Sequence, residues 1–309
     1  MPLDPALRGL TILERGWLSS NNVLLHGGGD GEPAMLVDSS HVAHAEQTVA
    51  LLRHALDGAP LSRVVNTHLH SDHCGGNAAL QRAFGCGVTI PPGHWQAVLD
   101  WDERALGYRS AGHRCERFVP DATLAPGEAL AVGGRRWDAL AAPGHDPHAI
   151  VLFDAANGVV ITADALWEDG FGVVFPEIDG EQAFDEVAAT LDLIESLGAR
   201  WVVPGHGAPF RDLAGALQRA RQRLAAFVAK PHRHDRHAAK VMVKYHLLEA
   251  RSCTWPALQA WFGASTLCLA LWRRLGEPGG SLAAFAEQIV AELAANGVLR
   301  VSDGCVHDA

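Results

Sequence analysis

The sequence predicts an α/β protein in which short strands alternate with helices. Apolar runs of strand length recur along the first part of the chain, and segments with helical spacing of apolar residues lie between several of them. A dense group of histidines and aspartates stands between one such strand and the next helix, where open α/β sheets place their active sites. With 309 residues, 48% of them hydrophobic, the chain is long enough for one large α/β domain and a smaller appendage.

The predicted elements of the first half begin with a hairpin, whose two strands are separated by a glycine-rich stretch. In order, they are hairpin strands over 23–25 and 34–37, a helix over 42–56, a strand over 63–66, a helix over 77–84 and a strand over 88–90. Gly58 and Gly85 follow the two helices, and glycine is a common residue just beyond a helix end.

The second half continues with strands that each precede a polar loop, and it ends with helices. The predicted elements are two short strands within 123–142, strands over 158–161 and 201–203, helices over 181–197, 212–229, 237–250 and 282–295, and a strand over 298–301. Residues 1–210 contain 12 basic and 27 acidic residues, a net charge of −15, whereas residues 211–251 contain 10 basic and 3 acidic residues, a net charge of +7. We therefore predict a catalytic domain over 1–210 and a mostly helical C-terminal domain over 211–309.

The segment between the strand over 63–66 and the helix over 77–84 is rich in metal-binding side chains. Three imidazoles and one carboxylate lie within six positions: His68, His70, Asp72 and His73. Neutral imidazole and carboxylate suit zinc and similar transition metals. A polar turn with solvated histidines is the alternative interpretation. Three later candidate ligands disfavour it, because each follows an apolar run of strand type: His145, Asp164 and His206.

His-x-His-x-Asp-His followed by Gly75-Gly76 resembles the signature of the metallo-β-lactamase fold superfamily of metal-dependent hydrolases. The resemblance spans about residues 10 to 210, and all seven ligand positions of the family are matched in the same order. It implies an αββα sandwich, in which two mixed β-sheets pack face to face with helices outside and the site at one edge. The C-terminal region resembles the small winged-helix-like appendage of some members, and we expect it to pack on the core or to mediate a homodimer.

The resemblance also implies a ligand set for two divalent metal ions. His68, His70 and His145 would bind one ion, Asp72, His73 and His206 the other, and Asp164 would bridge them. A metal-bridging hydroxide would be the nucleophile, and Asp72 would be the catalytic residue that orients it. These ligands suit zinc best, with manganese or iron as alternatives.

Three further side chains near these loops are expected to orient a ligand or contact the substrate: His148, Trp167 and Phe171. His148 lies close to His145 in the sequence, where outer partners of metal ligands are common. The two aromatic residues belong to an apolar loop after Asp164, which favours an apolar acyl or aryl group over a bare phosphate. For each of them, packing in the protein core is the alternative interpretation.

The expected function is hydrolysis of a small-molecule ester, thioester or lactone. One alternative is a phosphodiesterase acting on single-stranded RNA or DNA, because the basic segment 211–251 would engage phosphates. The acidic charge of residues 1–210 opposes binding of nucleic acid, so such a partner is not expected. The other alternative is a single-iron persulfide dioxygenase, a branch of the family that shares part of the ligand set.

The chain is expected to be a cytoplasmic protein without a membrane segment. Met1–Pro5 lacks a basic region followed by an apolar one, and no apolar run approaches the roughly 18 residues of a membrane span. The six cysteines are scattered without a Cys-x-x-Cys pair, so we expect reduced thiols and neither a disulfide framework nor a sulfur-only zinc site.

Overall fold

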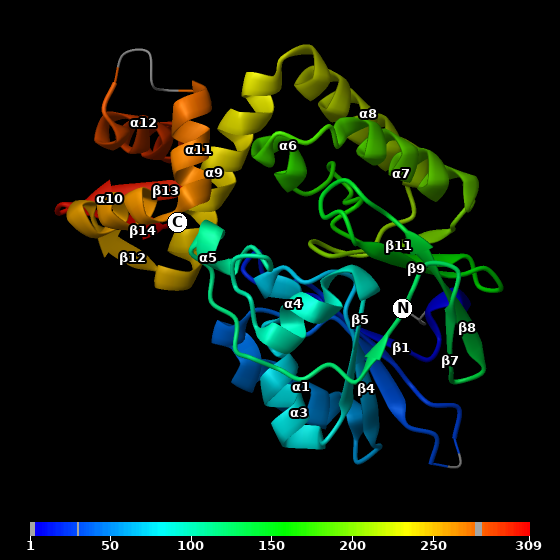
Figure 1. The fold of residues 1–309 in the computed structure, drawn as a ribbon. Helices are drawn as coiled ribbons and strands as arrows, with labels where there is room; N and C mark the ends of the chain where they lie inside the picture. Colours follow the sequence, from blue (N-terminus) through cyan, green and yellow to red (C-terminus); the bar gives the residue numbers. More distant parts are fainter. Residues whose placement is uncertain (1–3, 30, 276–279) are drawn as a thin grey trace.

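The computed structural model describes residues 4–29, 31–275 and 280–309. Two mixed β-sheets pack face to face, helices cover their outer faces, and a further helical group with a small sheet lies to one side (Figure 1). This arrangement confirms the expected fold class, an αββα sandwich with a helical C-terminal region.

The first sheet has the strand order β1-β2-β3-β4-β5-β6. Its first three strands pair antiparallel and β3 to β6 pair parallel, so the sheet is mixed. The strands are Leu10–Leu13 (β1), Asn22–Leu25 (β2), Ala34–Val37 (β3), Leu61–Val65 (β4), Gly87–Ile90 (β5) and Ala122–Thr123 (β6). The helices of this half are Ala45–Leu56 (α1), Ser71–Cys74 (α2), Asn77–Phe84 (α3), Trp95–Asp100 (α4) and Tyr108–Ala111 (α5).

The second sheet has the strand order β11-β10-β9-β8-β7. Only β10 and β11 pair parallel within the described part of this sheet. Its strands are Ala129–Val132 (β7), Arg135–Ala141 (β8), Ile150–Asp154 (β9), Val159–Ala163 (β10) and Trp201–Pro204 (β11). The helices beside it are Phe175–Asp179 (α6), Phe184–Ser196 (α7) and Leu213–Ala229 (α8).

The alternation of side chains along the strands produces the layers. In β4, Val65 lies in the core between the sheets, and its neighbour Val64 packs with the helices α1, α3 and α4. In β10, Ile161 lies in the core between the sheets, and Val160 packs with α7 and α8. Both strands bury both faces, which explains why their sequences are continuous apolar runs.

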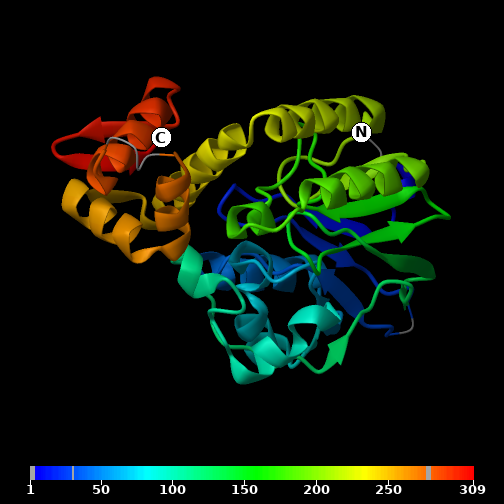
Figure 2. The same cartoon turned by 45° about the horizontal axis from the view of Figure 1, so that its top comes forward.

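The C-terminal elements form a helical group with a small sheet, reached from the sandwich through the long helix α9 (Figure 2). They are Pro231–Ala250 (α9), Ser252–Thr254 (β12), Trp255–Ala264 (α10), Thr266–Leu275 (α11), Leu282–Ala295 (α12), Leu299–Ser302 (β13) and Cys305–Asp308 (β14). β14 pairs with both β12 and β13. Helices followed by a terminal hairpin are consistent with the winged-helix-like arrangement expected from the sequence.

The C-terminal elements share a hydrophobic core with the sandwich part. Ala111 of α5, Ile178 of α6 and Val173, which precedes α6, belong to the same buried cluster as residues of α9, α10, α11 and α12. Ser265 Oγ also donates a hydrogen bond to the carbonyl oxygen of Ser110 at 2.8 Å. The C-terminal group is therefore held against the segments around α5 and α6.

Several elements differ from the sequence predictions. The helix expected from residue 237 begins at Pro231, because proline fits the first turn of a helix, where its missing N–H needs no partner. The strands β1, β9, β12 and β14 and the helices α10 and α11 were not predicted.

The domain division at residue 210 stays a prediction, and α8, just beyond it, packs on α7. In the described ranges, no helix has the length and apolar character needed to cross a membrane.

Candidate metal centre

The turn between β4 and α3 carries His68, His70, Asp72 and His73, and it ends in two glycines. The glycines are required because the backbone here passes close to another loop. A Cβ on Gly76 would lie 2.2 Å from the carbonyl oxygen of Ser39, and a Cβ on Gly75 would lie 2.5 Å from the backbone nitrogen of Val42. The Gly-Gly pair therefore holds α2 and its side chains tightly against the loop after β3.

Three imidazoles converge on one side of this turn. Nε2 of His68 lies 3.1 Å from Nδ1 of His70, which in turn lies 2.8 Å from Nε2 of His145. His145 is carried by the loop after β8, and its Nδ1 donates to the carbonyl oxygen of Val173 at 2.6 Å. Since a carbonyl can only accept, this bond selects the tautomer of a neutral His145 ring in which Nε2, the nitrogen facing the other two rings, is free to bind a metal.

A second group combines two imidazoles with two carboxylates. Nε2 of His206 lies 3.1 Å from Oδ2 of Asp72, and Nε2 of His73 lies 3.3 Å from Oδ1 of Asp164. Within each of the two groups, the candidate ligand atoms all lie within 4.8 Å of one another. The structure thus brings together all seven side chains that the sequence singled out as ligands.

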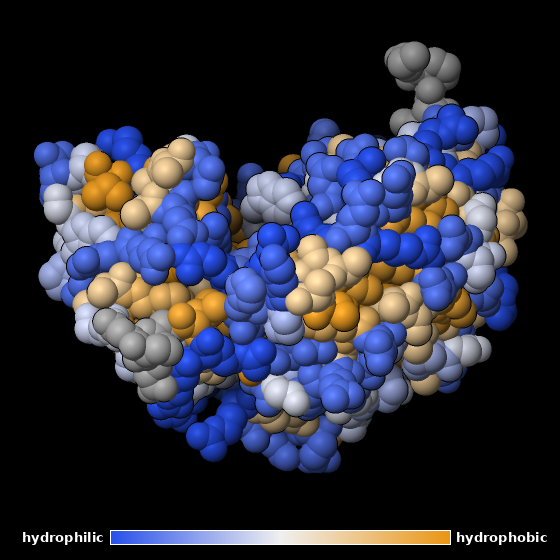
Figure 3. All heavy atoms as spheres, turned by 90° about the horizontal axis from the view of Figure 1, so that it is seen from above, coloured by the Kyte–Doolittle hydropathy of each residue, from blue (hydrophilic) through white to orange (hydrophobic). Residues whose placement is uncertain are grey.

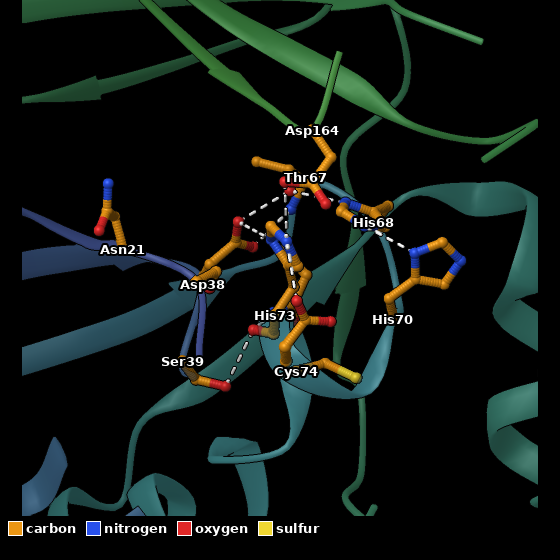
Figure 4. Close-up of polar contacts among 12 residues, drawn as sticks. Asn21, Asp38, Ser39, Thr67, His68, His70, His73, Cys74 and Asp164 are labelled. Carbon is orange, nitrogen blue, oxygen red and sulfur yellow. Dashed lines mark hydrogen bonds and ion pairs between the residues drawn. The ribbon is translucent and has the colours of Figure 1, made fainter. Parts of the chain in front are cut away.

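Asp164 lies between the two groups. Its Oδ1 faces His73, and its Oδ2 lies 3.4 Å from Nε2 of His145. Asp164 follows β10 and His206 follows β11, and these strands run parallel, so their carboxyl ends place both residues at one edge of the sheet. Figure 4 shows Asp164 reaching from the second sheet towards His68 and His73, which come from the turn after the first.

Asp38 contacts His73 on the ring nitrogen that faces away from Asp72 and Asp164 (Figure 4). Its Oδ2 lies 2.7 Å from Nδ1 of His73, and it accepts hydrogen bonds from the backbone nitrogen and Oγ1 of Thr67 at 2.9 and 2.8 Å. A carboxylate on the outer nitrogen of an imidazole fixes the tautomer and the ring orientation. Asp38 was not predicted as a site residue. Its position after β3, which runs parallel to β4, is the signal that predicts it.

Burial and mutual charge set the protonation of these groups. Burial lowers the pKa of His68 well below its usual range and the pKa of His70 to about 3, and neighbouring imidazoles add to both shifts. Burial opposes the charged form of His73 as well, but nearby carboxylates, Asp164 above all, raise its pKa well above the usual value. Burial, the largest single cause, would raise the pKa of Asp72 and Asp164, but the imidazoles around them, His73 and His206 above all, together outweigh it and lower both. Both carboxylates are therefore ionised, which is the form that binds a metal.

The donor atoms fit bound divalent ions. Nε2 of His73 is buried, points at the carboxylates of Asp72 and Asp164, and has no hydrogen-bond partner in the described part of the chain. A buried polar atom without a partner costs free energy, and a cation at this place would remove that cost. Imidazole nitrogens and carboxylate oxygens are also the donors that zinc and iron accept.

Two tryptophans border the second group. Trp17 stacks on His206 with ring centroids 5.3 Å apart, and Trp167 packs edge-on against Trp17 at 5.4 Å. Trp167 also donates from Nε1 to Oδ1 of Asp164 at 3.1 Å. Trp17 is 57% exposed in spite of its size. Trp17 was missed in the sequence because it stands alone, far from any motif.

The structure places Phe171 differently from the expectation. Its ring is buried among residues of the second sheet, α7 and α8, edge-on to Phe227 with centroids 6.2 Å apart. Phe175, four positions later, lies beside the candidate ligands instead. Its ring is edge-on to His70 at 5.0 Å and to His145 at 5.6 Å.

His148 also lies outside the group of candidate ligands. It is exposed, and its ring packs edge-on against His94 with centroids 4.6 Å apart. Its backbone nitrogen donates to Oδ1 of Asp146 at 2.7 Å. Asp146 is the buried residue of this pair, and its Oδ2 lies 3.9 Å from Nε2 of His70. Asp146 therefore occupies the place beside a ligand that was expected for His148.

Cys74 points away from the candidate ligands into the protein. Its thiol is buried and lies 3.1 Å from the hydroxyl of Tyr108 and 3.8 Å from the sulfur of Cys115. Cys74 is therefore a small buried residue of the core around α1 and α3 rather than a candidate ligand.

A cavity of about 770 Å³ opens beside the seven side chains. On one side it is lined by ligand candidates and by the two tryptophans, and on the other side by α9, α11 and α12. Tyr245 of α9 reaches the ligand turn, where its hydroxyl lies 3.0 Å from Oγ of Ser71. The C-terminal elements therefore form one wall of the cavity, which no sequence motif had indicated.

The fold and the convergent side chains define a metal-binding αββα sandwich protein. The sequence profile of the metallo-beta-lactamase superfamily matches residues 15–206, more than half of the chain. The chain belongs to this superfamily, as its sequence motif implied.

Individual relatives agree with this assignment. A hydroxyacylglutathione hydrolase of Anaeromyxobacter dehalogenans is 29% identical over 194 residues, which make up 63% of this chain and 64% of that protein. The chain covers less than two thirds of the length of the first curated relatives it matches. A solved metallo-beta-lactamase family protein of Thermus thermophilus is 22% identical, with a TM-score of 0.54 over 97% of this chain and 99% of that one. TTHA1623, solved in a di-iron-bound form, is 26% identical, with a TM-score of 0.53 over 68% of this chain and 98% of that one.

Proposed function

We propose that this chain is a binuclear metal-dependent hydrolase that cleaves a small-molecule ester, thioester or lactone. The observation that carries the proposal is the placement of Asp164, whose two carboxylate oxygens face different groups of candidate ligands. Two sets of donors joined by one carboxylate suit a pair of closely spaced ions. The name hydroxyacylglutathione hydrolase, carried by relatives, supports the thioester among the three substrate classes.

The proposed ligands divide into the two groups described above. His68, His70 and His145 would hold one ion, Asp72, His73 and His206 would hold the other, and Asp164, which faces both groups, would be available to either. Zinc suits these donors best, and the di-iron-bound relative supports iron as the alternative. When bound, the ions supply a water that loses a proton near neutral pH and an electrophile for the substrate oxygen.

The side chains of the protein orient the reactants. Asp72 borders the cavity, and its carboxylate accepts a hydrogen bond from the attacking water. The water oxygen forms a bond to the carbonyl carbon, the bond from that carbon to the leaving sulfur or oxygen breaks, and the leaving group takes up a proton. Trp17 and Trp167 pack beside this point on the side of His206.

The ion pairs within the basic segment 211–251 disfavour the nuclease alternative. Most of the basic side chains that suggested phosphate binding are engaged with acidic partners of the same chain. The pairs are Arg219 with Asp169, Arg221 with Asp192 and Glu195, Arg236 and Lys240 with Glu292, and Lys244 and Arg251 with Asp308. A paired cation has less to gain from a phosphate, so the segment offers a weaker attraction for nucleic acid than its sequence indicates.

The proposal is tested with a substrate panel on protein whose metal content is known. The panel contains esters, thioesters, lactones, a phosphodiester and single-stranded RNA, together with a persulfide and dioxygen. We expect turnover of an ester, thioester or lactone by protein that holds about two ions per chain. Turnover of RNA, or oxygen consumption by protein with one iron per chain, would replace the proposal with one of its two alternatives.

A further inference from the structure

The cavity is larger than the metal-binding group requires. Its volume of about 770 Å³ lies in the range of sites that enclose ligands of drug size, about 300–1,000 Å³. The candidate ligands and the two tryptophans occupy one end. The other end, which we call the C-terminal arm, lies between α9, α11 and α12, and Figure 3 shows the surface hollowed between the C-terminal elements and the sandwich.

The C-terminal arm is lined mainly by apolar side chains. They are Val241 and Met242 of α9, Leu267 and Ala270 of α11, Leu293 of α12, and Val298. Met242, Leu267 and Leu293 are buried, so they present fixed walls to whatever enters the arm. Phe175, which packs against His70, also lines the cavity, so apolar surface continues from the arm to the candidate ligands.

The two lysines and the histidine at the border of the arm carry little unpaired charge. Two basic side chains at its border form ion pairs, Lys240 with Glu292 and Lys244 with Asp308, whereas Arg223 donates a hydrogen bond to the carbonyl oxygen of Phe171. His237 lines the cavity too, and burial lowers its pKa to about 4, which leaves it uncharged at neutral pH. An apolar group that enters the arm beside Lys240, Lys244 and His237 therefore buries no unpaired charge of these three residues.

We infer that the C-terminal arm binds the apolar acyl chain of the substrate, so that α9, α11 and α12 determine acyl specificity. This inference rests on the proposed hydrolase function and narrows its substrate class to esters or thioesters of medium or long apolar acids. Burying the acyl chain places the scissile carbonyl at the candidate ligands. The polar alcohol or thiol then leaves towards Trp17 and the exposed carboxylate of Asp169, where the cavity is open to water.

Substitutions that fill the arm test this inference. Ala270→Phe places a ring among the apolar walls, and Thr266→Phe does the same from an exposed position of α11, where added bulk disturbs packing less. We expect both to lower kcat/KM for octanoyl relative to acetyl thioesters about tenfold or more, because the loss of one methylene contact in an apolar pocket changes discrimination by about 10- to 200-fold. Ala260→Phe, at an exposed position of α10, is the matched control and should keep the wild-type ratio of kcat/KM for octanoyl and acetyl thioesters.

Binding of octanol provides a readout that needs no turnover. Calorimetry on the wild-type chain should show binding with a negative heat-capacity change, and both filling variants should weaken it about tenfold or more. Folding of each variant is confirmed by its melting transition. An unchanged acyl preference together with unchanged octanol binding in both variants overturns the inference while leaving the hydrolase proposal intact. Octanol binding without hydrolysis of any ester or thioester by metal-loaded protein refutes the proposed function instead.

Discussion

Asp38 and His73 form a buried pair in which Oδ2 of the carboxylate lies 2.7 Å from Nδ1 of the imidazole. The pair turns Nε2 of His73 towards Asp72 and Asp164. Asp38→Asn replaces the acceptor by a group that also donates, so the ring loses its fixed tautomer. We expect metal affinity to fall about 10- to 100-fold with the fold retained, measured by competition with a chelator. Asp57→Asn, at an exposed position, is the control; equal affinity in the two variants would remove Asp38 from the site.

Replacing Asp72 by Asn tests its role towards the attacking water. The amide keeps the size of the side chain and loses the negative charge that would accept a hydrogen bond from the water and orient it. Turnover should fall by about two orders of magnitude or more, while circular dichroism and most of the metal content stay unchanged. Wild-type turnover in protein with both ions present would show that Asp72 has no catalytic part.

The hydrogen bond from Trp167 to Asp164 predicts that Trp167 contributes to metal affinity, because it holds the carboxylate that lies between the two groups of candidate ligands. Trp167→Phe keeps an aromatic ring beside Trp17 but removes the Nε1 donor that lies 3.1 Å from Oδ1 of Asp164. Hydrogen bonds to charged groups contribute about 1.5–3 kcal/mol, so we expect metal affinity to fall about tenfold or more. Trp17→Phe preserves stacking on His206 and serves as the comparison. If both variants bind metal equally well, the indole donor does not support Asp164.

His234 predicts a pH dependence of stability away from the metal centre. Its Nε2 accepts from the backbone nitrogen of Val174 at 3.1 Å, and burial, followed by the charge of Arg274, lowers its pKa to about 4. In the unfolded chain, histidine titrates near about 6.5, so the unfolded state takes up a proton first as the pH falls. The stability that neutral His234 contributes is therefore complete above about pH 6.5 and is lost as the pH falls towards 4.

The measurement is the melting temperature of metal-free protein between these pH values. His234→Gln keeps an acceptor without a titrating group, so its melting temperature should fall less steeply than that of the wild type. His232→Gln, at the exposed start of α9, is the control and should follow the wild-type curve. Parallel curves for the wild type and His234→Gln would contradict the assignment.

The ligands were predictable from the sequence because each stands at a fixed position relative to a strand end. His145, Asp164 and His206 all follow apolar runs, and parallel strands deliver their carboxyl ends to one edge. The aromatic neighbours were less predictable. Phe171 and Phe175 lie in one irregular stretch of the chain. Because this stretch has no helical or strand periodicity, the sequence does not indicate which ring faces the ligands and which lies in the core.

The C-terminal wall of the cavity could not be predicted for a different reason. Tyr245, Met242 and Ala270 belong to helices whose sequences look like ordinary amphipathic segments, and only tertiary packing brings them opposite the ligand turn. The same holds for the basic segment, which suggested a polyanion partner until its ion pairs within the chain were known.

The number of metal ions per chain tests the central claim most directly. The count is made by mass spectrometry on wild-type protein and on Asp164→Asn. We expect about two ions per chain in the wild type, because two groups of donors are present with a carboxylate between them. The variant should retain both ions less well, since Asp164 faces His145 with one oxygen and His73 with the other. One ion or none in fully folded wild-type protein, however it is loaded, would contradict a binuclear centre.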